Sequence, residues 1–226
     1  MGALSHLRIP ATRAYASAPF ITDCTAGVRT ELSGTVFEQW VAKTANWLEA
    51  EFDMGVRVAV QLRAHWLWPV LVAALDEIEG AIVPREDADA IIRIGPSPTE
   101  TLPVIAIHEH SMALPFREAL PANHYDFFRD VRSGGDVRPP GPTHDELLLQ
   151  TPDLMLTGRD LLALAHAFDG PERIALRVDA RGLAMPDQIA WLTVAPWASR
   201  SSLVLADGSS SITGERATIE VALPQH

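Results

Sequence analysis

The apolar and polar positions form their clearest pattern between Gly55 and Pro84. Residues 56, 58, 60 and 62 are valine or leucine, an alternation that is typical of a buried strand. Residues 66–79 predict a helix that is apolar on nearly all sides and therefore lies between other layers, and residues 81–83 return to the sheet. A strand, a helix and a strand in this order predict parallel pairing with a right-handed crossover.

Other segments extend this unit in both directions. Residues 20–32 predict a hairpin, and an apolar stripe at 37–52 predicts an amphipathic helix that is capped by Ser33 or Thr35. A helix is expected after the capping box that Thr157 begins, and another at 186–197. Further strands are expected at 89–94, 102–107, 174–178, 202–205 and 217–222.

Two segments lack such periodicity. Residues 1–18 are expected to form a partly ordered N-terminal arm, and residues 19–226 a single α/β domain. Within that domain, prolines and glycines repeatedly interrupt residues 108–153, which predict a functional loop or a seam between lobes, with a short helix or turn at 124–131. The predicted fold class is therefore α/β, with a layered, mostly parallel sheet and flanking helices.

Composition narrows the classes of function. The chain has 226 residues, of which 47% are hydrophobic and 21% charged, and a net charge of −11, which disfavours a nucleic-acid partner or an anionic membrane surface. Cys24 is the only cysteine, so neither an internal disulfide nor a cysteine-based zinc site is expected. The N-terminus lacks the order of a signal peptide, and no apolar run is long enough to span a membrane. A cytoplasmic protein is the expectation.

Several segments stand in the order found in one large family. They are TELS at 30–33, GVRVAV at 55–60, EGA at 79–81, LTGRDLL at 156–162, APW at 195–197 and SLVL at 202–205. This order resembles the N-terminal part of adenylate-forming enzymes, which include acyl-CoA synthetases, luciferases and peptide-synthetase adenylation domains. The chain is also similar to short bacterial proteins of about this length. The resemblance implies a layered α/β fold like the N-terminal subdomain of these enzymes.

The chain differs from that family at the residues that adenylation requires. The family binds ATP phosphates with a loop rich in threonine, serine and glycine that ends in Pro-Lys-Gly, whereas residues 144–153 read HDELLLQTPD, with no glycine or lysine and three acidic residues. The family's aromatic-histidine motif is replaced by Asp179 to Gly182, and its adenine motifs and C-terminal lid lie beyond the match. Lys43, the only lysine, sits on the first amphipathic helix. No adenylation and no cofactor are therefore expected.

Histidines give the few metal-like features. His108 and His110 share one face of an extended segment, and His124 or His144 would complete a site, but polar residues are ordinary where a strand enters a loop. We therefore expect no metal.

A pocket is considered at two places. His65 and Trp66 stand at a strand-to-helix turn, where parallel sheets bind ligands, although His65 equally suits a helix cap. Asp179 and Arg181 stand where the family has its aromatic-histidine motif. Cys24 lacks an adjacent base and is expected to be a bystander thiol, and residues 133–136 are expected to form a turn rather than an anion site.

Two hypotheses of function follow. The first is a non-catalytic binding or assembly module with an adenylate-forming fold, acting as a homodimer or with a protein partner that covers an apolar face. The second is an enzyme or small-molecule-binding protein that uses a remnant acyl or nucleotide pocket without ATP chemistry. The first is preferred.

Overall fold

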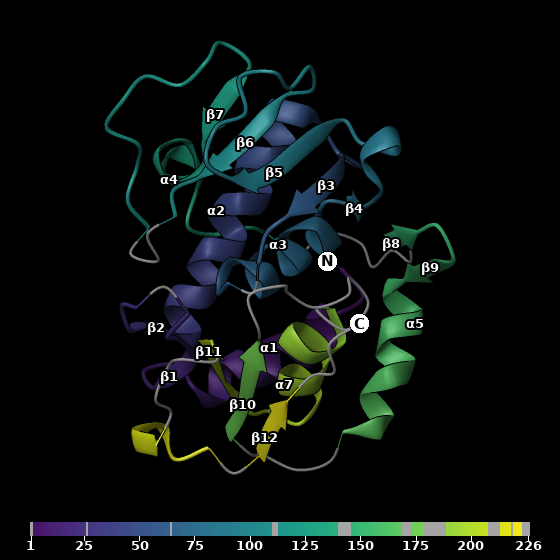
Figure 1. Ribbon diagram of the computed structural model, residues 1–226. Coiled ribbons are helices and arrows are strands. Elements are labelled where there is room, and N and C mark those ends of the chain that lie inside the picture. Colours follow the sequence, from purple (N-terminus) through teal and green to yellow (C-terminus); the bar gives the residue numbers. More distant parts are fainter. Residues whose placement is uncertain are drawn as a thin grey trace.

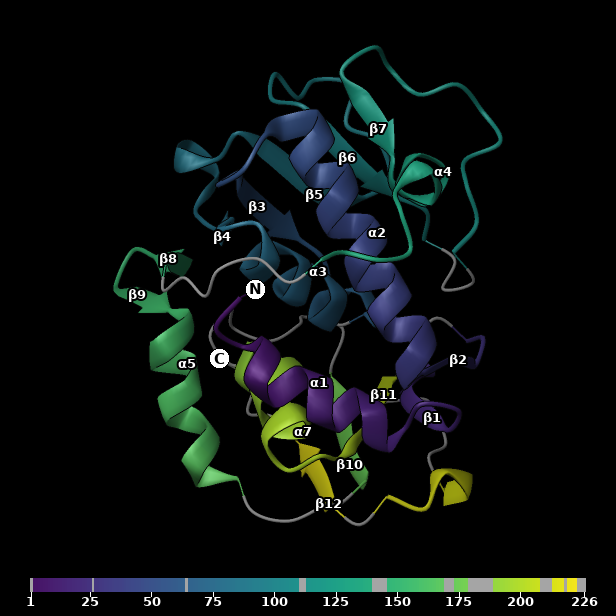
Figure 2. The ribbon, with the colours of Figure 1, turned by 180° about the vertical axis from the view of Figure 1, so that it is seen from behind.

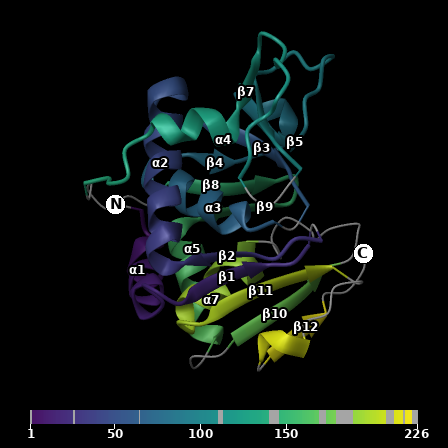
Figure 3. The same ribbon diagram turned by 90° about the vertical axis from the view of Figure 1, so that its left-hand side faces the viewer.

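The computed structural model describes residues 2–25, 27–63, 65–109, 113–139, 146–168, 173–178, 189–207, 213–217 and 219–222. Among them the strands form one seven-stranded and one five-stranded sheet, and Figure 1 shows helices lying between the two. Figure 3 shows the sheets one above the other, with the long helix α2 (Gly34–Phe52) running along one side of both. No helix among these residues is long and apolar enough to cross a membrane.

The seven-stranded sheet is built on the stretch that dominates the sequence pattern. Its order is β7-β6-β5-β3-β4-β8-β9, and every pairing is parallel except the β8–β9 hairpin. Its strands are β3 (Arg57–Gln61), β4 (Ala81–Ile82), β5 (Ala90–Ile94), β6 (Val104–Ile107), β7 (His124–Asp126), β8 (Leu147–Thr151) and β9 (Leu154–Thr157). The central strands are buried on both faces, which explains their continuous β-branched runs. The prediction of parallel pairing is confirmed.

The five-stranded sheet joins the two ends of the chain. Its order is β12-β10-β11-β1-β2, and only the predicted hairpin β1–β2 is antiparallel. Its strands are β1 (Pro19–Asp23), β2 (Thr30–Ser33), β10 (Arg173–Val178), β11 (Ser202–Asp207) and β12 (Ile219–Ala222). Ile21 of β1 pairs with Leu203 of β11, so the first strand is inserted beside strands that follow about 180 residues later.

The helices mostly confirm the pattern. Ser33 caps α2, because its Oγ accepts the Val36 N–H at 3.3 Å. The apolar helix is α3 (Leu67–Glu77), which is buried on almost every side between the sheets. The other α-helices are α1 (Ser5–Ala14), α4 (Phe127–Asp130), α5 (Gly158–Leu164) and α7 (Ala195–Ala198). The single turns are η1 (Arg85–Asp87), η2 (Val131–Ser133), η3 (Ala165–Ala167), the π-turn η4 (Ala190–Val194) and η5 (Thr213–Glu215).

Within the expected, partly ordered arm at 1–18, residues 5–14 form helix α1, which packs against α2 and α7 (Figure 2). Ala11 joins the apolar core, but several contacts of this segment are polar: the Leu4 N–H donates to Asp76 at 3.0 Å, and the buried Arg8 pairs with Glu77 at 2.6 Å and with Glu38. A helix that buries polar residues gives no apolar period for sequence reasoning to detect. The division of the chain into an arm and one domain stays a prediction.

Two other expectations change. Residues 146–153, which belong to the stretch expected to be irregular, contain strand β8. The short helix or turn expected at 124–131 is present as α4 and η2, and strand β7 directly precedes it. The capping box is confirmed, since Thr157 Oγ1 accepts the Asp160 N–H at 3.3 Å while Asp160 accepts the Thr157 N–H at 2.8 Å.

Candidate binding pocket at Trp66

A buried carboxylate joins the carboxyl ends of β1 and β3. Asp23, the last residue of β1, accepts the Trp66 N–H at 2.9 Å, and its other oxygen accepts the N–H of Thr25 at 2.8 Å and the hydroxyl of Thr25 at 2.7 Å. Sequence reasoning missed Asp23. The signal available was the Asp-x-Thr spacing, which is typical of an Asx turn at a strand end.

His65 lies fully buried beside this junction, with 1% of its surface exposed. Its Nδ1 accepts the Leu67 N–H at 3.1 Å, so the ring caps the first residue of α3, as one of the two interpretations of this residue expected. Within the described residues its Nε2 has no hydrogen-bond partner. Desolvation lowers the pKa of His65 to about 4, against an opposing effect of Asp23, so the imidazole is neutral near pH 7.

Trp66 is the floor of a small pocket at these carboxyl ends. The pocket has a volume of about 280 Å³ and is lined by Leu32, Val36, Trp40 and Trp66, with Arg29 and Glu31 at its rim. The rings of Trp40 and Trp66 meet edge to face with centroids 5.5 Å apart, and Phe128 stacks behind Trp66 at 6.0 Å. This place matches the general rule that parallel sheets bind ligands beyond the ends of their strands.

The charges at the rim are already paired. Arg29 donates to Glu31 at 2.7 Å and to Glu215 at 2.7 Å, and these bonds raise the pKa of Arg29 above its ordinary value. Glu215 also accepts from Arg173 at 2.9 Å. Two guanidinium groups are thus balanced by two carboxylates, which leaves no surplus positive charge for a carboxylate or phosphate. The pocket therefore suits a small, largely apolar and uncharged group.

The other predicted site residues do not converge on this pocket. His108 packs on Phe116, with ring centroids 5.1 Å apart, while His110, Asp179 and Arg181 lie outside the described residues. His124 uses both ring nitrogens, since Nδ1 lies 2.8 Å from Asn123 Oδ1 and Nε2 accepts the Ser97 N–H at 2.9 Å.

The metal, thiol and anion candidates from the sequence do not form a second site among the described residues. No group of three potential metal ligands gathers in the part of the chain that the structure covers. Burial, followed by the charge of Glu215, raises the pKa of the Cys24 thiol, which disfavours a nucleophile. The 133–136 segment packs on α2, where Asn46 donates to the Gly135 carbonyl at 3.0 Å.

A larger cavity of about 530 Å³ lies between α1, α2 and the segment around Val137. Most of its lining charges are engaged in pairs, among them Arg8 with Glu38 and Arg138 with Glu49, while Arg13 forms no ion pair among the described residues. These pairs leave little unbalanced charge, so this cavity is the weaker candidate despite its size.

The place of the family's phosphate loop is filled by a tight turn. Thr151 of β8 pairs with Leu154 of β9, so only Pro152 and Asp153 connect the strands. Proline has no N–H, and Asp153 adds negative charge. The turn borders a cavity of about 460 Å³ that is also lined by Glu86 and Asp87. The backbone N–H groups and the lysine of a phosphate loop are thus replaced by acidic side chains.

Comparison with known proteins agrees with this architecture. No known family profile matches the chain. Among solved structures, a Brucella canis acyl-CoA synthetase superimposes with a TM-score of 0.74 and 15% identity, over 99% of this chain and 47% of that one. The fold is that of the N-terminal part of acyl-CoA synthetases. The N-terminal domain of FACL13 from Mycobacterium tuberculosis gives a TM-score of 0.67 and 15% identity over 97% of this chain and 62% of that one.

The relative found by sequence comparison has a description that names no activity. A Mycobacterium tuberculosis protein described as a TIGR03089 family protein is 29% identical over 234 residues, covering 95% of this chain and 87% of its own length. Against solved synthetases such as that of Brucella canis, the chain spans about half their length. These likenesses establish the fold, and function has to be argued from the residues.

Proposed function

We propose that this chain is a binding or assembly module built on the acyl-CoA synthetase N-terminal fold, and that it does not form acyl-adenylates. The observation that carries the proposal is the two-residue turn at Pro152 and Asp153. A triphosphate needs several backbone N–H donors and added positive charge at this point. The turn supplies neither.

The single lysine of the chain does not supply the positive charge that a triphosphate would need. Lys43, the only lysine, projects from α2 and forms an ion pair with Asp136. Asp136 borders the cavity between α1 and α2, whereas the turn at Pro152 and Asp153 borders a separate cavity. Phosphoryl and nucleotidyl transfer rely on cations held against the developing charge, so the acidic cavity beside Asp153 opposes this chemistry.

An exchange assay tests the proposal directly. The chain is incubated with ATP, magnesium, labelled pyrophosphate and a panel of fatty and aromatic acids, with an acyl-CoA synthetase as the positive control. We expect no exchange above the protein-free background. Acid-dependent exchange that survives further purification and scales with the concentration of this chain contradicts the proposal.

A second candidate function is the binding of a small molecule in the pocket at Trp66. The paired aromatic rings and a volume of about 280 Å³ support a flat, uncharged ligand close to the lower size limit of such sites. Ligand-observed NMR with uncharged aromatic fragments tests it. Binding should be lost in Val36→Phe, which fills the pocket from its rim, and retained in Met155→Ala on the distant hairpin. Equal binding by both variants rejects this site.

We also propose that the module works with a protein partner or as a homodimer. Support comes from large apolar side chains exposed around the hairpin and α5, namely Leu154, Met155 and Leu164. Light scattering over a range of concentrations tests the homodimer. If the chain is monomeric at every concentration, the homodimer is rejected and only a different protein partner remains.

A further inference from the structure

The outer edge of the seven-stranded sheet is open at β9. In the described part of the chain, β9 is the last strand of its sheet, and only β8 pairs with it. The hairpin and α5 stand at the margin of the molecule in Figures 1 and 2. An edge strand of this kind carries backbone N–H and C=O groups that another extended segment can pair with.

Apolar side chains accompany that edge. Leu154 is 36% exposed and Met155 is 66% exposed, and both belong to β9. Folded chains commonly protect such an edge with lysine, proline or a bulge placed on the strand itself. Here Pro152 precedes the strand, and residues 154–157 read LMLT without a charge. The strand therefore carries no protecting charge, although the N–H of Thr157 at its end is already bonded to Asp160 at 2.8 Å.

The adjoining cavity of about 460 Å³ gives the edge a charge preference. It is lined by Glu86, Asp87 and Asp153 together with Leu154 and Met155. Asp87 is engaged, since it accepts from Gln150 at 2.7 Å. Among the described residues, the carboxylates of Glu86 and Asp153 form no hydrogen bond or ion pair, so they remain available to a cation.

We propose that the edge of β9 receives an extended, arginine- or lysine-bearing segment of another protein. The segment adds as a further strand, its apolar side chains pack on Leu154 and Met155, and a basic side chain enters the cavity toward Glu86 and Asp153. This inference rests on the proposed binding role and names its partner. Charge argues against a second copy as the occupant, because the chain has a net charge of −11 and two copies would bring these carboxylates together.

A defined peptide probes the surface. The probe is a fluorescein-labelled, amidated hexapeptide of alternating arginine and valine, and binding is followed by fluorescence anisotropy at low ionic strength. We expect saturable binding that weakens as salt is raised. A glutamate–valine peptide tests charge. An arginine–valine peptide with N-methylated alternate residues tests backbone pairing, because it lacks half of its N–H donors. Both are expected to bind at least about tenfold more weakly.

Matched variants assign the residues. Glu86→Gln with Asp153→Asn should weaken the arginine–valine peptide about tenfold, whereas Glu118→Gln, on an exposed loop away from the hairpin, should leave its affinity unchanged. Met155→Lys should abolish binding by repulsion, whereas Met155→Glu should bind more tightly than Met155→Lys. Thermal unfolding of each variant checks that the fold is intact.

The outcomes separate this inference from the proposed function. An affinity that is unchanged in the double variant, or equal binding of the N-methylated peptide, overturns the strand-addition proposal. So does a homodimer that Met155→Lys dissociates, because that result assigns the edge to a second copy. If the arginine–valine peptide does not bind while pyrophosphate exchange stays at background, only this inference is rejected. Exchange above background removes the proposed function regardless of the peptide result.

Discussion

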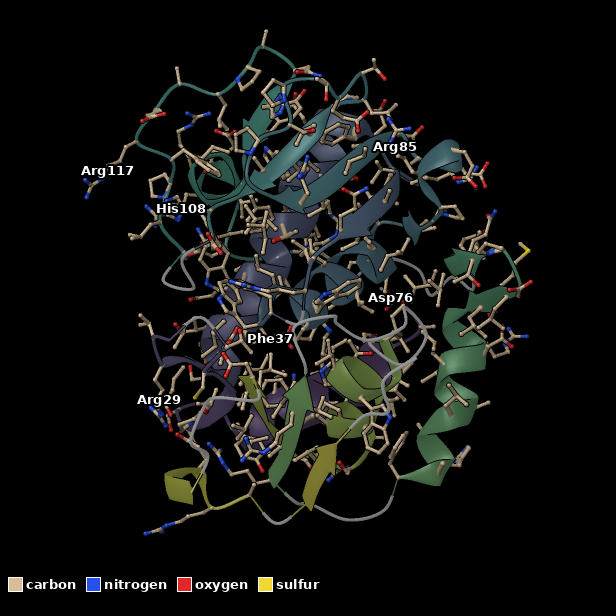
Figure 4. The ribbon with its side chains drawn as sticks, viewed as in Figure 1. Arg29, Phe37, Asp76, Arg85, His108 and Arg117 are labelled. Carbon is tan, nitrogen blue, oxygen red and sulfur yellow. The ribbon has the colours of Figure 1, made fainter. Side chains whose placement is uncertain are left out.

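The pocket at Trp66 and the cavity beside Asp153 both follow strands of the seven-stranded sheet, yet they are built in opposite ways. Figure 4 places Arg29, which lines the pocket at Trp66, on one side of the molecule and Arg85, next to Glu86, on the other. The first is aromatic and is held by the buried carboxylate of Asp23. The second is exposed and acidic, and its turn is only two residues long.

The difference separates what maintains the fold from what changes its chemistry. At Trp66, burial and hydrogen bonds tie the two sheets together, so a substitution there is expected to affect folding. At Pro152 and Asp153 the side chains touch little, so the fold tolerates replacement of a phosphate loop by an acidic turn. The following predictions test this contrast.

The largest effect is expected for Trp66→Ala. The side chain is 1% exposed and packs on Trp40 and Phe128, so its removal leaves a cavity that costs about 3–5 kcal/mol. Urea unfolding followed by circular dichroism measures this loss. Met155→Ala is the matched control at the hairpin, where less than about 0.5 kcal/mol is expected. Equal losses at the two positions would remove the contrast.

The next largest effect is the pH dependence of stability that His65 contributes. Its folded pKa of about 4 lies below the ordinary 6.5, so the unfolded chain binds more protons between these values and stability rises with pH across that window. Asp76 opposes this, because desolvation raises its pKa from 3.8 to about 7 and stability from this group falls as pH rises between those values. The Asp76→Asn background therefore isolates His65.

In Asp76→Asn, unfolding free energy should rise by at most about 3 kcal/mol from pH 4 to pH 6.5. In Asp76→Asn with His65→Gln, that rise should disappear. Urea titrations at several pH values provide the measurement. A slope that persists without His65 would assign the pH dependence to other groups and contradict a buried neutral imidazole at the junction.

A smaller loss is expected for Asp23→Ala. The N–H of Trp66 and the N–H of Thr25 both lose their acceptor, which costs about 2 kcal/mol. Asp153→Ala is the matched control at the acidic turn and should change stability by less than about 0.5 kcal/mol. Thermal unfolding of the two variants compares them. A control as damaging as Asp23→Ala would mean that the acidic turn is also structural.

The smallest effect is expected for Glu86→Gln with Asp153→Asn. These exposed carboxylates line one cavity and have no hydrogen-bond or ion-pair partner among the described residues, so the unfolding free energy should stay within about 0.5 kcal/mol of that of the parent chain. Thermal unfolding at low salt is the sensitive measurement. A loss beyond that range would show that the acidic cavity contributes to folding.

The sequence predicts the parts of the fold that depend on apolar periodicity. The run of β-branched residues gave β3, and the uninterrupted apolar helix gave α3, because burial on both faces leaves a direct record in the sequence. Helix α1 escaped prediction because it docks through Arg8 and through the capping of its first turn by Asp76, contacts that depend on partners distant in the chain.

The candidate site was predictable only in part. Trp66 and the cap at His65 follow from a strand-to-helix turn. Trp40 lies within the predicted helix at 37–52, but its role as a pocket wall depends on how α2 lies against β2. The acidic 144–153 segment was identified from its residues, but its two-residue turn required the register of β8 and β9.

Calorimetric titration with magnesium ATP tests the central claim most directly, because that claim concerns the place where a phosphate loop would stand. The chain with Pro152 and Asp153 in that place is predicted to give no binding heat at millimolar nucleotide, and replacing Asp153 by asparagine should not create any. A saturable isotherm with a micromolar dissociation constant would contradict the account, because this turn offers no cradle for a triphosphate.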